Sequence, residues 1–247
     1  MDYRLSHLSS GKGASYENSF HKNISRKYIW DWEKEILIKI VNKYFTDRPE
    51  NYLDFACGTG RIIEHLSPFA LNALGVDISD SMLDVAKSKK NLKNVKFIKA
   101  DITEKNIIGD VRFDLITAFR FFLNAQVSLK KEAIAKLSML LSDNGILVFN
   151  IHMNRTSFLA IVTRIYQLVR NIEKSNMMSF SEVNNLVQFA GLEIVDTYHY
   201  GVIPIVRENS LLPYRLIDKI ERLFSSIPIA RIFSQNIIYV CKKKENL

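Results

Sequence analysis

Two aspartates and two glycines stand at spacings that suit a ligand-binding turn. Asp54 precedes Gly58 and Gly60, and Asp77 follows after a further apolar segment. Glycine permits positive φ and has no Cβ, so a ligand can approach the backbone of such a turn closely. A carboxylate about 20 residues beyond a glycine turn can accept hydrogen bonds from the hydroxyls of a ribose. Because Asp54 would repel a pyrophosphate, the turn favours a cationic ligand, such as one with an ammonium group.

A strand and a helix are needed to hold this turn in place. The apolar run at residues 52–55 stops before the glycines, and a helix-like segment follows at residues 61–66. A buried strand that ends in a glycine turn and leads into a helix is the first half of a βαβ unit. The helix would direct its free N–H groups and the positive end of its dipole towards the ligand. A second strand at residues 73–76 would deliver Asp77.

These residues resemble the motifs of the class I S-adenosylmethionine-dependent methyltransferases. Residues 52–61 resemble motif I, and residues 75–79 match the segment that carries the family's ribose-binding acid. Residues 99–102 match the segment of its adenine-contacting acid, and residues 113–116 match its fourth strand. The resemblance implies an α/β fold, a Rossmann-like three-layer sandwich. Its seven-stranded sheet would be mostly parallel, with a final antiparallel hairpin strand and helical inserts. The alternative is a Rossmann-like domain that uses the glycines only to reverse the chain.

The resemblance implies S-adenosyl-L-methionine as the cofactor. Asp54, Gly58 and Gly60 would hold its methionine end and Asp77 its ribose hydroxyls. Two positions have open alternatives: Met82 lies beside the adenine or only packs in the core, and Arg61 reaches the cofactor's carboxylate or is solvated. The full expected set is Asp54, Gly58, Gly60, Asp77, Ile78, Met82, Asp101, Ile102 (through its backbone) and Phe119, which would line the sulfonium pocket.

Three further residues are candidates for action on the methyl acceptor. His152 follows a buried strand at the catalytic edge, and an imidazole can take a proton near neutral pH; a structural histidine is the alternative. Arg120 follows the fourth strand and, with Asn124, would bind an anionic or hydroxylated acceptor, unless it forms a structural ion pair. Tyr16 and His7 would close over the site from an N-terminal lid, or they are ordinary surface residues.

We expect the 247 residues to form a single methyltransferase domain, a length that can bury a sizeable core. Residues 1–48 would form a lid and a helix with Ile36 and Ile40 inward and Glu33 elsewhere on its circumference. Residues 49–152 would be the cofactor-binding core, and the inserts 153–180 and 202–235 would shape the acceptor site. Further helices are expected at 80–92, 129–141, 156–173, 181–190 and 214–224, and further strands at 95–100, 113–119, 146–151, 192–200 and 236–242, with a turn at 143–145.

Composition bounds the function but does not choose the substrate. The net charge of +8 suits nucleic acid, an anionic membrane surface or anionic small substrates. The start of the chain lacks the pattern of a secretory signal, and no run approaches the ~18 apolar residues of a spanning helix. The two cysteines, one of them in the glycine turn, make a structural disulfide improbable and indicate a cytoplasmic protein. No metal site is expected.

We expect a methyltransferase (EC 2.1.1.-) that methylates oxygen on a glycan, glycolipid or other small-molecule acceptor. The Asn-Pro-Pro-Tyr or Asp-Pro-Pro-Tyr signature of amino-group methylases is absent after the fourth strand, where residues 120–124 stand. The chain also resembles enzymes associated with bacterial glycan or lipid modification. The alternatives are an RNA methyltransferase, suggested by the charge, and a protein that binds the cofactor without turnover. The basic, apolar segment at 214–224 would contact the inner face of a membrane or serve in core or oligomer packing.

Overall fold

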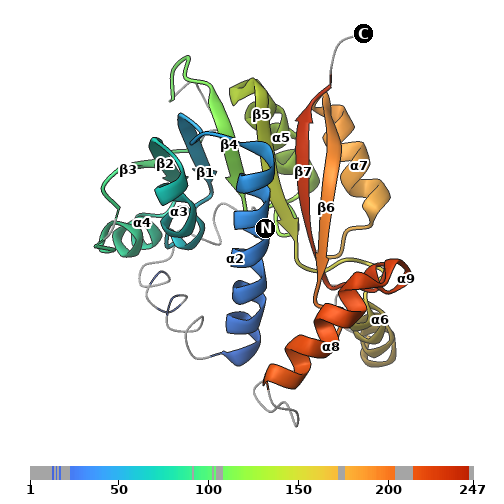
Figure 1. Ribbon diagram of the computed structural model, residues 1–247. Helices are drawn as coiled ribbons and strands as arrows, with labels where there is room; N and C mark the ends of the chain where they lie inside the picture. Colours follow the sequence, from blue (N-terminus) through green and yellow to red (C-terminus); the bar gives the residue numbers. More distant parts are fainter. Residues whose placement is uncertain are drawn as a thin grey trace.

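The computed structural model describes residues 13, 15, 17, 23–90, 92–101, 103, 108–171, 176–203 and 214–244, without the side chains of Ile24, Ser25, Tyr214, Arg215 and Ser226. A seven-stranded sheet with the order β3-β2-β1-β4-β5-β7-β6 lies at the centre (Figure 1). The strands are β1 (Asn51–Phe55), β2 (Asn72–Asp77), β3 (Val95–Lys99), β4 (Phe113–Ala118), β5 (Leu141–Ile151), β6 (Leu192–Tyr200) and β7 (Asn236–Lys243).

Strands β1 to β5 run parallel, and β7 pairs antiparallel with both β5 and β6. Strands β1 and β4 lie in the middle of the sheet, and most of their side chains are buried. Strands covered on both faces are largely apolar, which explains why hydrophobic residues predominate in β1 and β4, although Asp54, Asp114 and Thr117 are polar. The carboxyl ends of the five parallel strands therefore meet at one edge of the sheet, the place where ligands bind in open α/β folds.

Helices cover both faces of the sheet and make three layers. One buried apolar cluster joins α2 and α3 to the sheet, and a second joins α5 and α7 to its other face (Figure 1). The predicted Rossmann-like sandwich with an antiparallel closing pair is thus confirmed. The helical elements are α2 (Ile24–Tyr44), α3 (Arg61–Leu66), η2 (Ser67–Phe69), α4 (Asp80–Lys87), α5 (Val127–Leu140), α6 (Phe158–Arg170), α7 (Phe180–Phe189), α8 (Tyr214–Ser226) and α9 (Pro228–Arg231).

Several local predictions need correction. Glu33, expected on the outer side of α2, is completely buried, because the helix turns this residue towards polar groups of β5 and β6. The expected turn at 143–145 lies within β5, where the pairing with β4 shifts register between Phe113 and Leu115. Helix α4 is shorter than predicted, α2 begins at Ile24 where the sequence predicted a helix over residues 29–45, and the short helix α9 was not predicted.

Side-chain caps define where two helices begin in the part of the chain that follows β5, namely α6 and α7. Ser157 accepts a hydrogen bond from the Ala160 N–H at the start of α6. Ser179 and Glu182 cap each other's backbone at the start of α7, an arrangement that satisfies two otherwise unpaired donors. Among the described helices, none has the length and apolar character that crossing a bilayer requires.

Candidate active site

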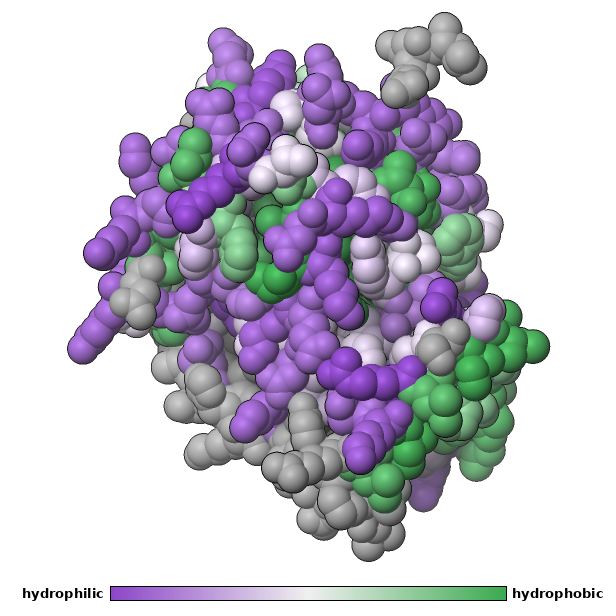
Figure 2. Space-filling view, viewed as in Figure 1, coloured by the Kyte–Doolittle hydropathy of each residue, from purple (hydrophilic) through white to green (hydrophobic). Residues whose placement is uncertain are grey.

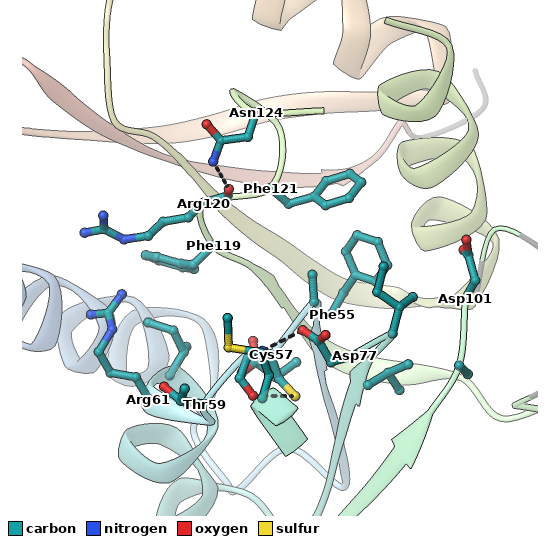
Figure 3. A pocket seen from close by; sticks show the side chains of 18 of the residues that line it. Phe55, Cys57, Thr59, Arg61, Asp77, Asp101, Phe119, Arg120, Phe121 and Asn124 are labelled. Carbon is teal, nitrogen blue, oxygen red and sulfur yellow. Dashed lines mark hydrogen bonds between the residues drawn. The ribbon is translucent and has the colours of Figure 1, made fainter. Parts of the chain in front are cut away.

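A cavity opens at the carboxyl ends of the parallel strands, and Figure 3 shows most of its lining. Asp54 and Asp77 both line it, as do His152 and Arg120, the two residues predicted to act on the acceptor. Gly60 does not line it, and Ile102, Tyr16 and His7 lie outside the described residues. The other predicted cofactor residues in its wall are Gly58, Ile78, Met82, Asp101 and Phe119.

The two glycines of the turn serve different purposes. Gly58 has a φ of 55°, and a Cβ built on it meets no atom within 4 Å. Its backbone therefore faces open space in the cavity wall and can lie against a ligand. Gly60 has a φ of 75°, and a Cβ there would lie 3.0 Å from Cβ of Ala86. Gly60 thus allows α3 and α4 to pack closely, which explains why it does not line the cavity.

Asp77 is held at the end of β2 by two backbone donors. Its Oδ2 accepts from the Gly58 N–H at 2.8 Å, and its Oδ1 accepts from the Ser79 N–H at 2.9 Å. A carboxylate can accept about four hydrogen bonds, so these two donors orient the group without exhausting its capacity. The geometry couples the acid to the glycine turn, as a ribose site requires.

We expect Asp77→Ala to weaken the binding of S-adenosylhomocysteine by about 1.5–3 kcal/mol. This is the scale of a hydrogen bond to a charged group. The loss also removes the acceptor that orients the Gly58 N–H. Titration calorimetry of the native and variant proteins measures the difference, with Asp84→Ala on α4, outside the cavity, as the control. Equal affinities for native protein and Asp77→Ala would contradict the ribose assignment.

Asp54 is buried, with a 1% exposed fraction, at the junction of β1, β4 and α3. Its Oδ1 accepts from Oγ1 of Thr117 at 2.6 Å, and its Oδ2 accepts from the Ile63 N–H at 3.2 Å. Burial raises the pKa of Asp54 from 3.8 to about 7, against the lowering effect of these two hydrogen bonds. The side chain therefore fixes the first turn of α3 while forming part of the cavity wall.

The raised pKa of Asp54 predicts a pH-dependent stability. Between about pH 4 and 7 the folded chain keeps the proton that the unfolded chain has released, so stability falls as the pH rises. Asp54→Asn resembles the protonated side chain and lacks this component. From about pH 5 to 7, the native protein should lose ~2 kcal/mol of unfolding free energy relative to the variant, at 1.36 kcal/mol per unit. Urea denaturation across this range measures it, and a constant difference between the two proteins would refute it.

Asp101 and Met82 belong to the predicted adenine end of the site, and both line the cavity. Asp101 follows β3, and its Oδ1 accepts from both the backbone N–H (3.0 Å) and the hydroxyl (2.6 Å) of Thr103. Met82 is buried at 4% exposure and also lines the cavity, so packing and ligand contact are both compatible with its position.

A buried ion cluster lies beside the cavity. A structural ion pair of Arg120 was one of the expected alternatives, but its partner Glu33 was not predicted. Glu33 Oε2 accepts from Nη1 of Arg61 at 2.7 Å, and its Oε1 lies 3.9 Å from Nη2 of Arg120. The same Oε1 accepts from the Tyr200 hydroxyl at 3.0 Å and from the Asn150 amide at 3.2 Å. Burial by itself would raise the pKa of Glu33, but the two guanidinium groups outweigh it, and the pKa lies below its ordinary value. The ionised Glu33 therefore holds both arginines at the cavity.

Arg120 occupies a strained backbone position after β4. Its φ of 60° is left-handed, which is unusual for a residue with a side chain. The Arg120 N–H donates to Oδ1 of Asn150 at 2.7 Å, and its carbonyl accepts from Nδ2 of Asn124 at 2.7 Å. Such strain persists where neighbours over-determine it, commonly at functional sites. Figure 3 shows the side chains of Arg120 and Arg61 pointing to the same side of the cavity.

His152 follows β5 and is half-buried in the cavity wall. Among the described residues, no group forms a hydrogen bond with its Nδ1 atom. Burial and the adjacent Arg120 guanidinium lower the pKa of His152 to about 3. The imidazole is therefore neutral at physiological pH and takes a proton only well below it, unlike the base near neutral pH that the sequence led us to expect. Its Nδ1 atom is out of contact with solvent.

One sequence signal could have identified Glu33. It lies three and four residues before Ile36 and Leu37, both of which are buried, so it shares their face of α2. Its partners Asn150 and Tyr200 come from β5 and β6, and no local pattern indicates that these strands approach α2.

The residues of the cavity fit S-adenosylmethionine. The open side of Gly58 accommodates a close backbone contact, and Asp77 offers a carboxylate to a ribose diol. Phe119 provides an apolar wall, and the acidic side chains of Asp54 and Asp101 can accept hydrogen bonds from the amino groups of a ligand. Arg120 and His152, the residues predicted to act on the acceptor, line the same cavity.

Comparison with known proteins supports this interpretation. A family model described as "Methyltransferase domain" matches residues 46–196, more than half of the chain. The malonyl-[acyl-carrier protein] O-methyltransferase of Bacillus cytotoxicus is 34% identical over 55% of this chain and 46% of that protein. The ubiquinone biosynthesis O-methyltransferase of Coxiella burnetii is 26% identical over 71% of this chain and 77% of that protein. The chain spans about half the length of the first curated relatives that it matches: the aligned region covers 39% to 51% of each relative's own length.

Solved structures share the fold. The magnesium protoporphyrin IX methyltransferase of Synechocystis, solved with bound S-adenosylmethionine, aligns with a TM-score of 0.63 at 13% identity. The alignment covers 99% of this chain and 98% of that one. An S-adenosylmethionine-dependent methyltransferase from Clostridium acetobutylicum aligns with a TM-score of 0.58 at 18% identity, over 94% of this chain and 99% of that one.

Proposed function

This chain belongs to the methyltransferase domain family, and we propose that it transfers the methyl group of S-adenosylmethionine to an oxygen atom of a glycan, glycolipid or other small acceptor. Its fold is that of the class I enzymes, and S-adenosylmethionine is the methyl donor that the family and the cavity support. The single observation that carries the proposal is one cavity that joins the Gly58–Asp77 pair to His152 and Arg120.

The oxygen specificity draws support from two sources. The relatives from Bacillus cytotoxicus and Coxiella burnetii are both named as O-methyltransferases. The neutral imidazole of His152 suits a hydroxyl, because one of its nitrogens can accept a hydrogen bond from an O–H group. A protonated imidazole has only donors, but His152 is not protonated at pH 7.

When bound, S-adenosylmethionine supplies a methyl group activated by its positively charged sulfur. The protein then mainly aligns the acceptor and excludes water. The imidazole of His152 would accept the proton of the acceptor hydroxyl as the O–C bond forms, while the sulfur–methyl bond breaks and S-adenosylhomocysteine leaves. An oxygen becomes strongly acidic as it gains the methyl group, so a base with a pKa of about 3 suffices. Arg120, held by Glu33, binds an anionic or hydroxylated part of the acceptor.

A screen with a donor that carries a labelled methyl group tests the proposal. The purified chain is incubated with separate pools of glycans, lipid-linked sugars, acyl-carrier-linked and quinone-type small molecules, amines and RNA. We expect label in an ether or ester of one small-molecule or lipid-linked pool. Label on nitrogen, or on RNA with the steep salt dependence that phosphate contacts cause, would contradict the proposal. Binding of the donor with no S-adenosylhomocysteine formed from any pool would indicate a non-catalytic binding protein.

A further inference from the structure

Helix α6 carries apolar side chains on its exposed side. Val162 and Ile165 are exposed by 60% and 57%, and Leu168 and Val169 by 75% and 78%. The residues that this helix buries include the polar Gln167. Surface helices of globular domains ordinarily show the reverse pattern, with the polar side towards solvent. The sequence of α6 is therefore suited to an apolar partner outside the described chain.

Helix α9 and the residue after it continue this surface. Ile229 is 70% exposed and Ile232 is 52% exposed. The rings of Phe158 and Phe233 stack at 4.8 Å, and Nδ2 of Asn154 donates to the Ile232 carbonyl at 3.2 Å, so the start of α6 is fixed against the end of α9. Figure 2 shows a broad hydrophobic surface at the lower right, over the region of α6, α8 and α9. We call the exposed apolar side chains of α6 and α9, with Ile232, the α6–α9 face.

The charges on the α6–α9 face all have one sign. Arg164 and Arg170 belong to α6 and Arg231 to α9, and all three are exposed. The sequence contains no aspartate or glutamate from residue 153 to 172 or from residue 222 to 244. A face whose side chains are apolar and whose charged groups are all basic complements an anionic lipid surface. Its apolar side chains can enter the boundary between headgroups and acyl chains, and its arginines can pair with phosphates.

The same charges disfavour a second copy of the chain as the partner. A two-fold dimer through the α6–α9 face would place equal patches against each other, each with three arginines and no acid. Repulsion between these patches opposes their pairing, whereas an anionic bilayer neutralises them. The 13 residues of α6 are too few to cross a bilayer, for which about 20 are needed, so the helix suits the interfacial plane.

We propose that the α6–α9 face binds the headgroup region of a membrane that contains anionic lipids, with α6 lying in the plane of the interface. The proposal does not depend on methyl transfer. The proposal also bears on how an acceptor reaches the cavity. Strand β5 ends just before His152, and α6 begins after its cap Ser157, so only a short segment separates the cavity from this helix. The bound membrane would then lie near the acceptor side of the cavity.

Co-sedimentation with vesicles tests the proposal on the full chain. Vesicles of phosphatidylcholine alone are compared with vesicles in which about a third of the lipid is phosphatidylglycerol. The native protein should bind the anionic vesicles and not the neutral ones. Because each basic residue near the surface contributes about fivefold, Arg164→Gln with Arg170→Gln should lower the partition coefficient about 30-fold.

Two double variants test whether binding requires the α6–α9 face or only exposed apolar side chains anywhere on the protein. Ile165→Ser with Val169→Ser removes apolar contacts from α6 and should abolish measurable binding. Val127→Ser with Met139→Ser alters two side chains of α5, exposed by 68% and 67%, and should bind as the native protein does. Circular dichroism confirms that each variant is folded.

Three results would overturn the proposal. The first is no sedimentation of the native protein with either vesicle. The second is equal binding to neutral and anionic vesicles, which would remove the role of the arginines. The third is a dimer detected by light scattering that Ile165→Ser with Val169→Ser converts to a monomer, since this would identify the α6–α9 face as a subunit interface.

Discussion

His152→Ala is expected to lower kcat by about 100- to 10,000-fold, the usual loss when a general base is removed. The affinity for S-adenosylhomocysteine should stay nearly unchanged, because the proposed contact of this side chain is with the acceptor and not with the cofactor. Since the pKa of His152 is about 3, the native enzyme should show no titration of this group in kcat between about pH 6 and 8. Single-turnover kinetics with an identified acceptor measures the loss.

A matched control comes from a histidine outside the cavity. His199 lies on β6, and its Nδ1 pairs with the Arg231 carbonyl at 3.0 Å. His199→Ala should change stability and leave kcat within a few-fold of the native value. If His152→Ala behaved in the same way, with an effect confined to stability, His152 would be a structural residue and the proposed proton transfer would be wrong.

Glu33→Ala is expected to destabilise the protein by about 3–5 kcal/mol. This is the cost of removing one partner from a buried ion cluster and leaving the other charges uncompensated. Glu33 is fully buried, while the side chains of Arg61 and Arg120 are 13% and 22% exposed, so neither arginine gains full access to water. Urea denaturation measures the change in unfolding free energy.

The neighbouring Glu35 provides the control on the same helix. It forms an ion pair with Arg222 at 3.0 Å, but both side chains are 47% exposed. Exposed pairs contribute about 0–1 kcal/mol, so Glu35→Ala should have a small effect. Glu33→Gln keeps the side-chain shape and should recover part of the stability, although it no longer neutralises the arginines. Equal losses for Glu33→Ala and Glu35→Ala would contradict the account of the cluster.

The position of Gly58 and Asp77 at one edge of the sheet could be predicted because its determinants are local in the sequence. The strand, the glycine turn and the helix that place Gly58 are consecutive, and Asp77 ends the next strand. Their relation to each other follows from the βαβ unit, which has a fixed handedness and short connections. The mostly parallel sheet with an antiparallel closing strand followed from the family resemblance that these motifs carry.

The acceptor side depended on long-range contacts and was predicted only in part. The position of His152 after β5 was predicted, but its low pKa follows from burial and from Arg120. The place of Arg120 is fixed by Asn150 on a neighbouring strand and by Glu33 on α2, and no local pattern encodes these distances. Helical periodicity likewise predicts that α6 is amphipathic, but it does not say which side of the helix the rest of the chain covers.

Gly60 illustrates a further limit of motif reasoning. Its place in the turn suggested contact with the cofactor, as for Gly58. The structure gives it a packing role against Ala86 of α4, which depends on how the two helices meet. Both roles require a residue without a Cβ, so sequence alone does not distinguish them.

Titration calorimetry of the purified, folded chain with S-adenosylhomocysteine tests the central claim most directly. We predict saturable binding of one molecule per chain to native protein, weakened by Asp77→Ala and nearly unaffected by His152→Ala. Absence of binding by S-adenosylhomocysteine and by S-adenosylmethionine would contradict the assignment of the cavity at the edge of the sheet.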